Sequence, residues 1–239
     1  MRGCLTSFFV LVALGLVASW ILLPPIAAGA IDQGLQLAGF QGSGRRVTVG
    51  ATPPLELLTL HADTVRVQAA DVTYHGLQVG SGDVTLGDVA LVDRTAGTID
   101  GTLTGVSFSG VDGLPVSVAS IGLSGTGGVV DATIALSAAE VRSLASKAVK
   151  AATGTAPTKM TLAAPNKVAV TIGKKTVSGT LDVDDAGGLV FVPSAGGPLA
   201  GPIDLVRPGP DVPLRLESVT VGPAGATLTG TVDPAIFRG

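Results

Sequence analysis

The chain has 239 residues, of which 46% are hydrophobic, 14% are charged and 3% are aromatic, and its formal net charge is −3. High hydrophobicity with so little charge excludes an intrinsically disordered chain. The negative net charge argues against nucleic acid as a partner, because phosphate binding needs a concentrated basic surface. The 34 glycines and 15 prolines indicate many turns between aliphatic strands. The single cysteine, Cys4, excludes a disulfide within the chain.

The first apolar segment, Leu5–Leu23, follows Arg2 and contains no charged residue. As a helix, its nineteen residues would span roughly 28 Å, close to the hydrocarbon thickness of a bilayer. We therefore predict a signal-anchor helix within residues 1–30 that crosses the cell membrane once and leaves everything after Pro24 on the extracytoplasmic, periplasmic side. The small residues Ala28-Gly29-Ala30 also have the form of a signal-peptide cleavage site, which leaves a secreted form as the alternative.

Residues 31–239 are predicted to form a single domain, and a short amphipathic helix near Ile26–Ala38 is predicted to dock on it. Alternation of apolar and polar residues in the rest of the chain predicts about ten or more short strands. Val65–Ala69 is one half-buried strand of this kind. Ser81-Gly82-Asp83 has the composition of a tight turn between two strands.

One amphipathic helix is predicted among the strands. Ser137 and Glu140 have the spacing of a capping box, and Gly154 and Pro157 end the helix. Many strands with one such helix predict an α+β fold, in which a curved, mostly antiparallel sheet is wrapped on a central amphipathic helix. The apolar stripe of the helix consists of Val141, Leu144, Ala145, Ala148 and Val149.

The sequence contains no convincing catalytic or metal-binding motif. The nucleophile pattern G-x-S-x-G is missing from it, and the two histidines, His61 and His75, have no cysteine partner, so we expect each at a strand end or turn. Asp182, Asp184 and Asp185 lack the spaced ligands of a calcium loop and predict a hairpin turn. We therefore expect no enzyme activity, no metal and no cofactor.

Between Glu140 and Lys175 the chain has seven bases and one acid, which is its main charge asymmetry. One interpretation is a surface for anionic lipid headgroups, to which each base would contribute on the order of 1 kcal/mol. The alternative is a solvated face that balances the acidic strands around it. The bases are Arg142, Lys147, Lys150, Lys159, Lys167, Lys174 and Lys175.

The chain resembles the LmeA-like phospholipid-binding family of actinobacterial cell envelopes, above all in the stretch Thr52–Val72. One departure lies at Pro54–Leu58, which reads PLELL where relatives often carry a large aromatic residue. The resemblance rests on the apolar segment Leu5–Leu23, the helix near Ile26–Ala38, Pro53-Pro54, the V-x-V pattern at Val65–Val67, the segment Leu77–Val89 and the capped helix after Leu136.

The resemblance implies a periplasmic domain like the tubular lipid-binding proteins, with affinity for anionic phospholipids such as phosphatidylinositol. In one branch of the family it also implies support of lipoglycan mannosylation. We predict a domain that binds or shuttles phospholipid in a groove between sheet and helix. Val141, Leu144 and Ala148 would contact the acyl chains, and Lys147 or Lys150 the headgroup. The alternative is an interaction domain without a lipid cavity that supports an envelope protein or a glycolipid-synthesis enzyme.

Overall fold

The computed structural model describes residues 22–74, 76–93, 95–109, 115–194, 199, 201–207 and 214–232. The predicted membrane helix lies outside these residues except for its last two positions, and so does His75. Within the described residues, no helix is both long and apolar enough to cross a bilayer. The described residues form thirteen strands, two α-helices and one 3-10 helix, which confirms the predicted α+β class with mostly antiparallel pairing.

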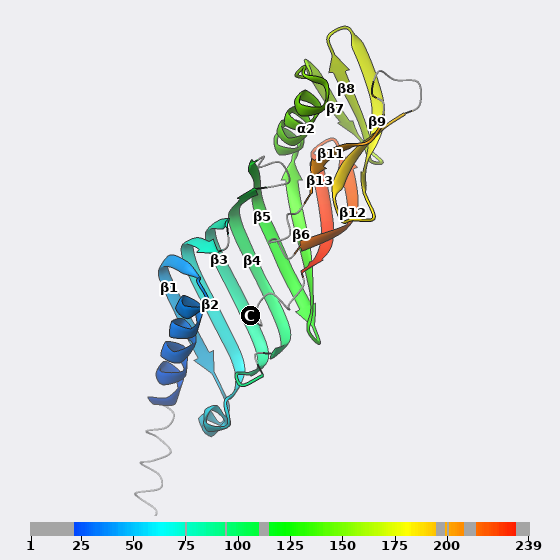
Figure 1. Cartoon of the computed structure of the whole chain (residues 1–239). Coiled ribbons are helices and arrows are strands. Elements are labelled where there is room, and N and C mark those ends of the chain that lie inside the picture. The colour runs from blue at the N-terminus through cyan, green and yellow to red at the C-terminus, as the bar shows by residue number, and fades with distance from the viewer. Residues whose placement is uncertain are drawn as a thin grey trace, which may run out of the picture.

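The larger sheet has eight antiparallel strands in the order β1-β2-β3-β4-β5-β6-β13-β12 and forms a long, twisted, open ladder (Figure 1). Strands β2 to β5 have 12 to 15 residues each, about twice the usual length, and each is paired along both edges. The strands are β1 (Gln41–Gly50), β2 (His61–Tyr74), β3 (Leu77–Ala90), β4 (Thr95–Ser109), β5 (Pro115–Thr126), β6 (Val129–Ser137), β12 (Leu214–Gly222) and β13 (Gly225–Val232).

The smaller sheet has five antiparallel strands in the order β11-β10-β9-β8-β7. It lies at the end of the molecule farthest from β1 (Figure 1). Its strands are β7 (Lys159–Ala163), β8 (Lys167–Ile172), β9 (Lys175–Val183), β10 (Leu189–Pro193) and β11 (Ile203–Val206).

The predicted turn at Ser81-Gly82-Asp83 is wrong, because β3 runs without a break from Leu77 to Ala90. All three residues pair with β2 on one side and with β4 on the other. Ser, Gly and Asp favour turns locally, but two flanking ladders satisfy the backbone groups of an extended segment and override that preference. Pairing is interrupted at Gly80 and Gly105 instead, and Gly105 has a φ of 60°, which glycine tolerates without steric cost.

The predicted capped helix is confirmed as α2 (Ala138–Thr153). The backbone N–H of Glu140 donates to Ser137 Oγ at 3.2 Å, and that of Ser137 donates to Glu140 Oε2 at 2.6 Å. Gly154 ends the helix in the left-handed conformation, and its N–H donates to the Lys150 carbonyl. The local pattern alone was therefore sufficient to place both ends of α2.

Helix α2 packs at one end of the larger sheet, against β5, β6, β13 and the β11 strand of the smaller sheet (Figure 1). Its apolar stripe joins both sheets in one cluster of buried residues, here called the main core. The larger sheet extends well beyond the helix on the β1 side and is open. The predicted wrapping of the sheet around a central helix is thus not the observed arrangement, since an amphipathic stripe fixes what a helix buries but not how much of a sheet it covers.

The helix formed by residues 22–37, here called the first helix, packs at the β1 end of the larger sheet (Figure 1). It confirms the short helix predicted near Ile26–Ala38 and spans the predicted boundary at residue 30. Leu23, Ala27 and Ile31 pack on a small cluster of buried residues, here called the second core, and Asp32 pairs with Arg45 of β1. The second core consists of Val49, Ala62, Val65, Val89 and Leu57, the last from the 3-10 helix η1 (Pro54–Thr59).

Candidate lipid-binding surface

Three cross-strand rows of the larger sheet carry only apolar residues and glycine. Side chains alternate between the faces of a strand, and directly paired residues share a face, so the pairing registers assign these rows to one face of the sheet, here called the apolar face. From β2 to β6, the rows are Ala69-Gly82-Leu103-Ile121-Ile134, Val67-Val84-Gly101-Leu123-Ala132 and Val65-Leu86-Ile99-Gly125-Val130.

The rows between them are almost entirely polar and form the opposite face. In β2 and β3, Arg66 binds Asp83 through two hydrogen bonds of 2.8 and 2.5 Å, and Gln68 donates a third at 3.0 Å. The hydrogen bonds from Arg66, followed by that from Gln68, lower the pKa of Asp83 to about 2. The sheet therefore has one face suited to water and one suited to hydrocarbon. The polar rows are Gln68-Asp83-Thr102-Gly122-Thr133 and Arg66-Thr85-Asp100-Ser124-Asp131.

The apolar face is covered at its two ends by different elements. Leu103 and Leu123 pack against the main core, while Val67 and Leu86 pack against the second core. Between them, Val84 and Ile99 are half-buried and, among the described residues, belong to neither cluster. We call this region the central strip and define it as Gly82, Val84, Leu86, Ile99, Gly101, Leu103 and Leu123.

Glycines shape the floor of the central strip. A Cβ atom on Gly101 would lie 2.8 Å from the carbonyl oxygen of Asp83 and 3.0 Å from Cα of Val84, so only glycine fits without a backbone shift. A Cβ atom on Gly82 would lie 3.2 Å from Cδ2 of Leu103. Glycine thus leaves room for neighbouring aliphatic side chains to pack close to the backbone of the sheet.

The site residues predicted on α2 are divided between core and surface. Val141, Leu144 and Ala148 are buried in the main core, while Lys147 and Lys150 are exposed. The described residues beside the helix enclose an apolar cavity of about 20 Å³, which is room for about one water-sized sphere. Leu144 lines this cavity, together with residues such as Phe108 and Leu216. Among the described residues, the space between sheet and helix is therefore small, and both the predicted groove and the headgroup role of the two lysines stay predictions.

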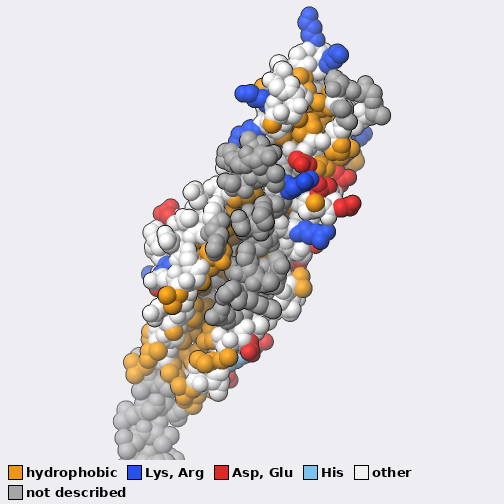
Figure 2. Space-filling view, in the orientation of Figure 1, with side chains coloured by type: hydrophobic (Ala, Val, Ile, Leu, Met, Phe, Trp, Pro, Cys, Tyr) orange, Lys and Arg blue, Asp and Glu red, His pale blue; other side chains and the backbone are white. Residues whose placement is uncertain are grey.

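The seven bases between Glu140 and Lys175 lie on α2 and the smaller sheet, at the end of the molecule opposite the first helix. Figure 2 shows Lys and Arg side chains at the outer end of the smaller sheet, and others near the middle of the molecule. Lys159, Lys167 and Lys175 are the first residues of β7, β8 and β9. Lys174 lies in the turn between β8 and β9, and all four lysines are exposed. These bases are consequently far from both the central strip and the start of the first helix (Figures 1 and 2).

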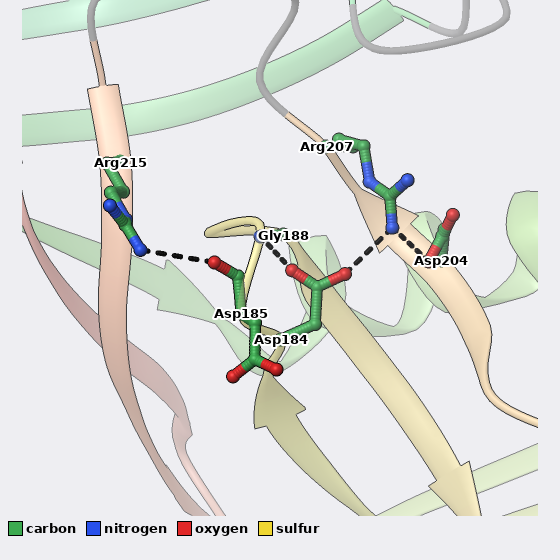
Figure 3. A network of polar contacts seen from close by, with 6 residues as sticks. All are labelled: Asp184, Asp185, Gly188, Asp204, Arg207 and Arg215. Carbon is green, nitrogen blue, oxygen red and sulfur yellow. Dashed lines mark hydrogen bonds and ion pairs between the residues drawn. The ribbon is translucent and has the colours of Figure 1, made fainter.

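The predicted hairpin at Asp182–Asp185 is confirmed: it joins β9 to β10, with Asp184 and Asp185 in the turn and Asp182 still within β9. Asp184 accepts two hydrogen bonds of 2.7 Å, one from the Gly188 amide and one from Arg207, which directly follows β11 (Figure 3). Arg215 of β12 donates a hydrogen bond of 3.1 Å to the Asp185 carbonyl. The Gly188 amide and the nearby Arg207 charge lower the pKa of Asp184. This network fastens the hairpin of the smaller sheet to β12 of the larger sheet.

The histidine that the structure describes, His61, lies at the start of β2, as predicted for a strand end. Its Nε2 atom is 3.1 Å from Oδ1 of Asp88 in β3. Across the described ranges, no three His, Cys, Asp or Glu side chains are grouped in a way that could hold a metal ion. His61 therefore makes a side-chain contact between β2 and β3.

Sequence reasoning missed the central strip. The signal for it was present, because in both GDVTL (Gly82–Leu86) and TIDGTLT (Thr98–Thr104) apolar residues or glycine alternate with polar ones. The turn predicted at Ser81–Asp83 divided β3 and hid this alternation. No family model matches the chain, and no curated protein or solved structure is detectably similar to it. The resemblance to the LmeA-like family thus stays a prediction from loose sequence patterns.

Proposed function

We propose that this protein binds phospholipid acyl chains on the apolar face of its larger sheet, as a membrane-attached module on the periplasmic side of the cell envelope. The observation that supports the proposal is the central strip. Its aliphatic side chains continue both cores, yet Val84 and Ile99 are only half-buried and belong to neither core. Such side chains gain free energy when an apolar ligand or partner removes them further from water.

The chemistry of the strip suits hydrocarbon rather than a polar ligand. Its floor consists of Val, Ile, Leu and Gly, with the polar residues of β3 and β4 on the opposite face. Covering apolar surface stabilises a complex by roughly 25 cal/mol per Å², or about 0.8 kcal/mol for each CH₂ group withdrawn from water. A row of methylene groups can follow the strip across several strands without leaving a hydrogen-bonding group unpaired.

The first helix supports membrane attachment. Leu22 and Leu23 are the last two residues of the uncharged segment that begins at Leu5, and Leu23 packs on the second core. The sheet is thereby tied closely to the predicted anchor. The resemblance to the LmeA-like family and to tubular lipid-binding proteins adds to the proposal and favours anionic phospholipids. In that setting the protein would carry or present lipid for envelope synthesis.

Lipid retention by the purified protein tests the proposal. The full chain and a chain that begins at Leu22, which keeps residues 22–37 of the first helix, are purified in non-ionic detergent and analysed by native mass spectrometry. We expect both proteins to retain phospholipid after detergent exchange. Lipid that is retained only by the full chain would be bound to residues 1–21, and the proposal would fail.

The second candidate is an interaction domain that supports an envelope protein or glycolipid-synthesis enzyme. The small volume of the cavity beside Leu144 favours it, since that region is filled by side chains as in an ordinary core. In that case a protein surface would cover the central strip. Neither chain would then retain lipid, and crosslinking in cells would join β3 or β4 to a partner protein.

A further inference from the structure

Six large apolar side chains are exposed at the end of the molecule where the first helix begins. They come from the first helix, from η1 with its following residue, and from the turn between β3 and β4. The described residues have two other exposed large apolar side chains, Leu37 and Val129. The six, here called the apolar tip, are Leu22 (56% exposed), Ile26 (65%), Leu55 (41%), Leu58 (65%), Leu60 (50%) and Val92 (67%).

The three segments of the apolar tip are held together by the second core. Leu57 of η1 is buried there, and Leu23 of the first helix and Leu91 of the β3–β4 turn pack against the same cluster. The Leu91 N–H donates to the Leu60 carbonyl at 2.9 Å, which joins the turn to the end of η1. Figure 1 shows the start of the first helix and η1 at the same end of the molecule. The exposed side chains are therefore presented on a fixed support.

The segments that carry the apolar tip contain few charges and are acidic on balance. Segments 22–30, 54–60 and 91–94 hold two acids, Glu56 and Asp93, and one base, Arg94. The exposed lysines lie at the opposite end of the molecule (Figure 2). A surface of this composition offers no cluster of bases to anionic headgroups and binds through its apolar area.

We propose that the apolar tip docks on a lipid bilayer, with its leucines in the interface and its binding independent of lipid charge. The occupant is indicated by the chain itself, because residues 5–21, immediately before Leu22, contain no charged residue and have the composition of a membrane segment. This inference rests on the membrane attachment in the proposed function and adds an orientation to it. The second core then stands directly on the bilayer, and the apolar face begins there.

Single-cysteine probes in the full chain test the docking. On a Cys4→Ser background, Leu58→Cys and Val92→Cys are labelled with an environment-sensitive fluorophore, and the protein is reconstituted into phosphatidylcholine vesicles. Leu37→Cys is the matched control, because Leu37 is exposed on the same helix about 22 Å along its axis from Leu22. We expect a blue shift, quenching by lipid-borne nitroxide and loss of iodide quenching at Leu58 and Val92, but not at Leu37.

Three results would overturn the inference. The tip probes could be quenched by iodide as strongly as the Leu37 probe. They could be shielded from both quenchers, which would show that protein, such as a second copy of the chain, covers the tip. Docking could also require phosphatidylglycerol. If the tip probes lie in the bilayer but the chain that begins at Leu22 retains no lipid, only the proposed function is rejected. If that chain retains lipid but the tip probes do not lie in the bilayer, only the docking is rejected.

Discussion

Replacing Val84 by glutamine should weaken phospholipid binding strongly. Val84 is half-buried in the middle of the central strip, in neither core. Covering the remaining half of a valine side chain contributes about 1 kcal/mol. An amide held under an acyl chain without a hydrogen-bond partner costs about 1–3 kcal/mol. The two effects together amount to roughly 2–4 kcal/mol, which is a loss of affinity of about thirtyfold or more.

The neighbouring residue supplies a matched control. Thr85 is also half-buried, but it lies on the polar face between Arg66 and Asp100. The same substitution there, Thr85→Gln, puts the amide in contact with water and should leave binding unchanged. Both variants are made in the chain that begins at Leu22 and titrated with a fluorescent phospholipid, while thermal unfolding followed by circular dichroism shows whether each remains folded.

The comparison separates lipid binding on the apolar face from general loss of stability. We expect Val84→Gln to remain folded at the assay temperature and to bind lipid weakly. Equal affinities for the two variants, with both proteins folded, would refute the assignment of the central strip as the lipid site.

Three further predictions concern stability. Leu144→Ala should lower the free energy of unfolding in urea by about 2–5 kcal/mol, because Leu144 is core rather than groove, while Lys150→Ala should change little; equal small effects would contradict this. Asn166→Ala should lower the free energy of unfolding by about 2–4 kcal/mol in the same assay, because it removes the hydrogen bonds of the Asn166 side chain with the backbone of Val219 and Val221. Asn166 also has a φ of 52°, a left-handed conformation that glycine adopts more easily than alanine, so Asn166→Gly should cost less. Because the pKa of Asp83 is lowered, its ion pair with Arg66 stabilises the fold above about pH 4 and is progressively lost toward pH 2. Asp83→Asn should therefore make the melting temperature fall less steeply between pH 4 and pH 2. The same dependence of melting temperature on pH in the variant and the original chain would rule this out.

Features that depend on neighbouring residues in the sequence were predictable. The Ser137–Glu140 capping box and Gly154 placed both ends of α2, because capping uses side chains within four positions of the helix end. The Asp182–Asp185 hairpin and the amphipathic first helix were predictable for the same reason. The broad α+β class followed from periodicity alone.

Features that depend on distant pairing were not predictable. Ser81-Gly82-Asp83 is extended because β2 and β4 pair with it from both sides, and nothing within the segment reveals those partners. The stripe of α2 showed which residues are buried but not that both sheets would fill the space around Leu144. The central strip needs the register of β2 to β6, and a shift of one residue would move every one of its side chains to the other face.

Photocrosslinking with a phospholipid that carries a diazirine in its acyl chain tests the central claim most directly. The full chain in vesicles is irradiated and digested, and the modified residues are mapped by mass spectrometry. The account predicts modification of Val84, Ile99 and Leu103 on the apolar face, with Thr85 and Thr102 unmodified. Modification confined to residues 1–37, or spread equally over both faces of β3 and β4, would contradict it.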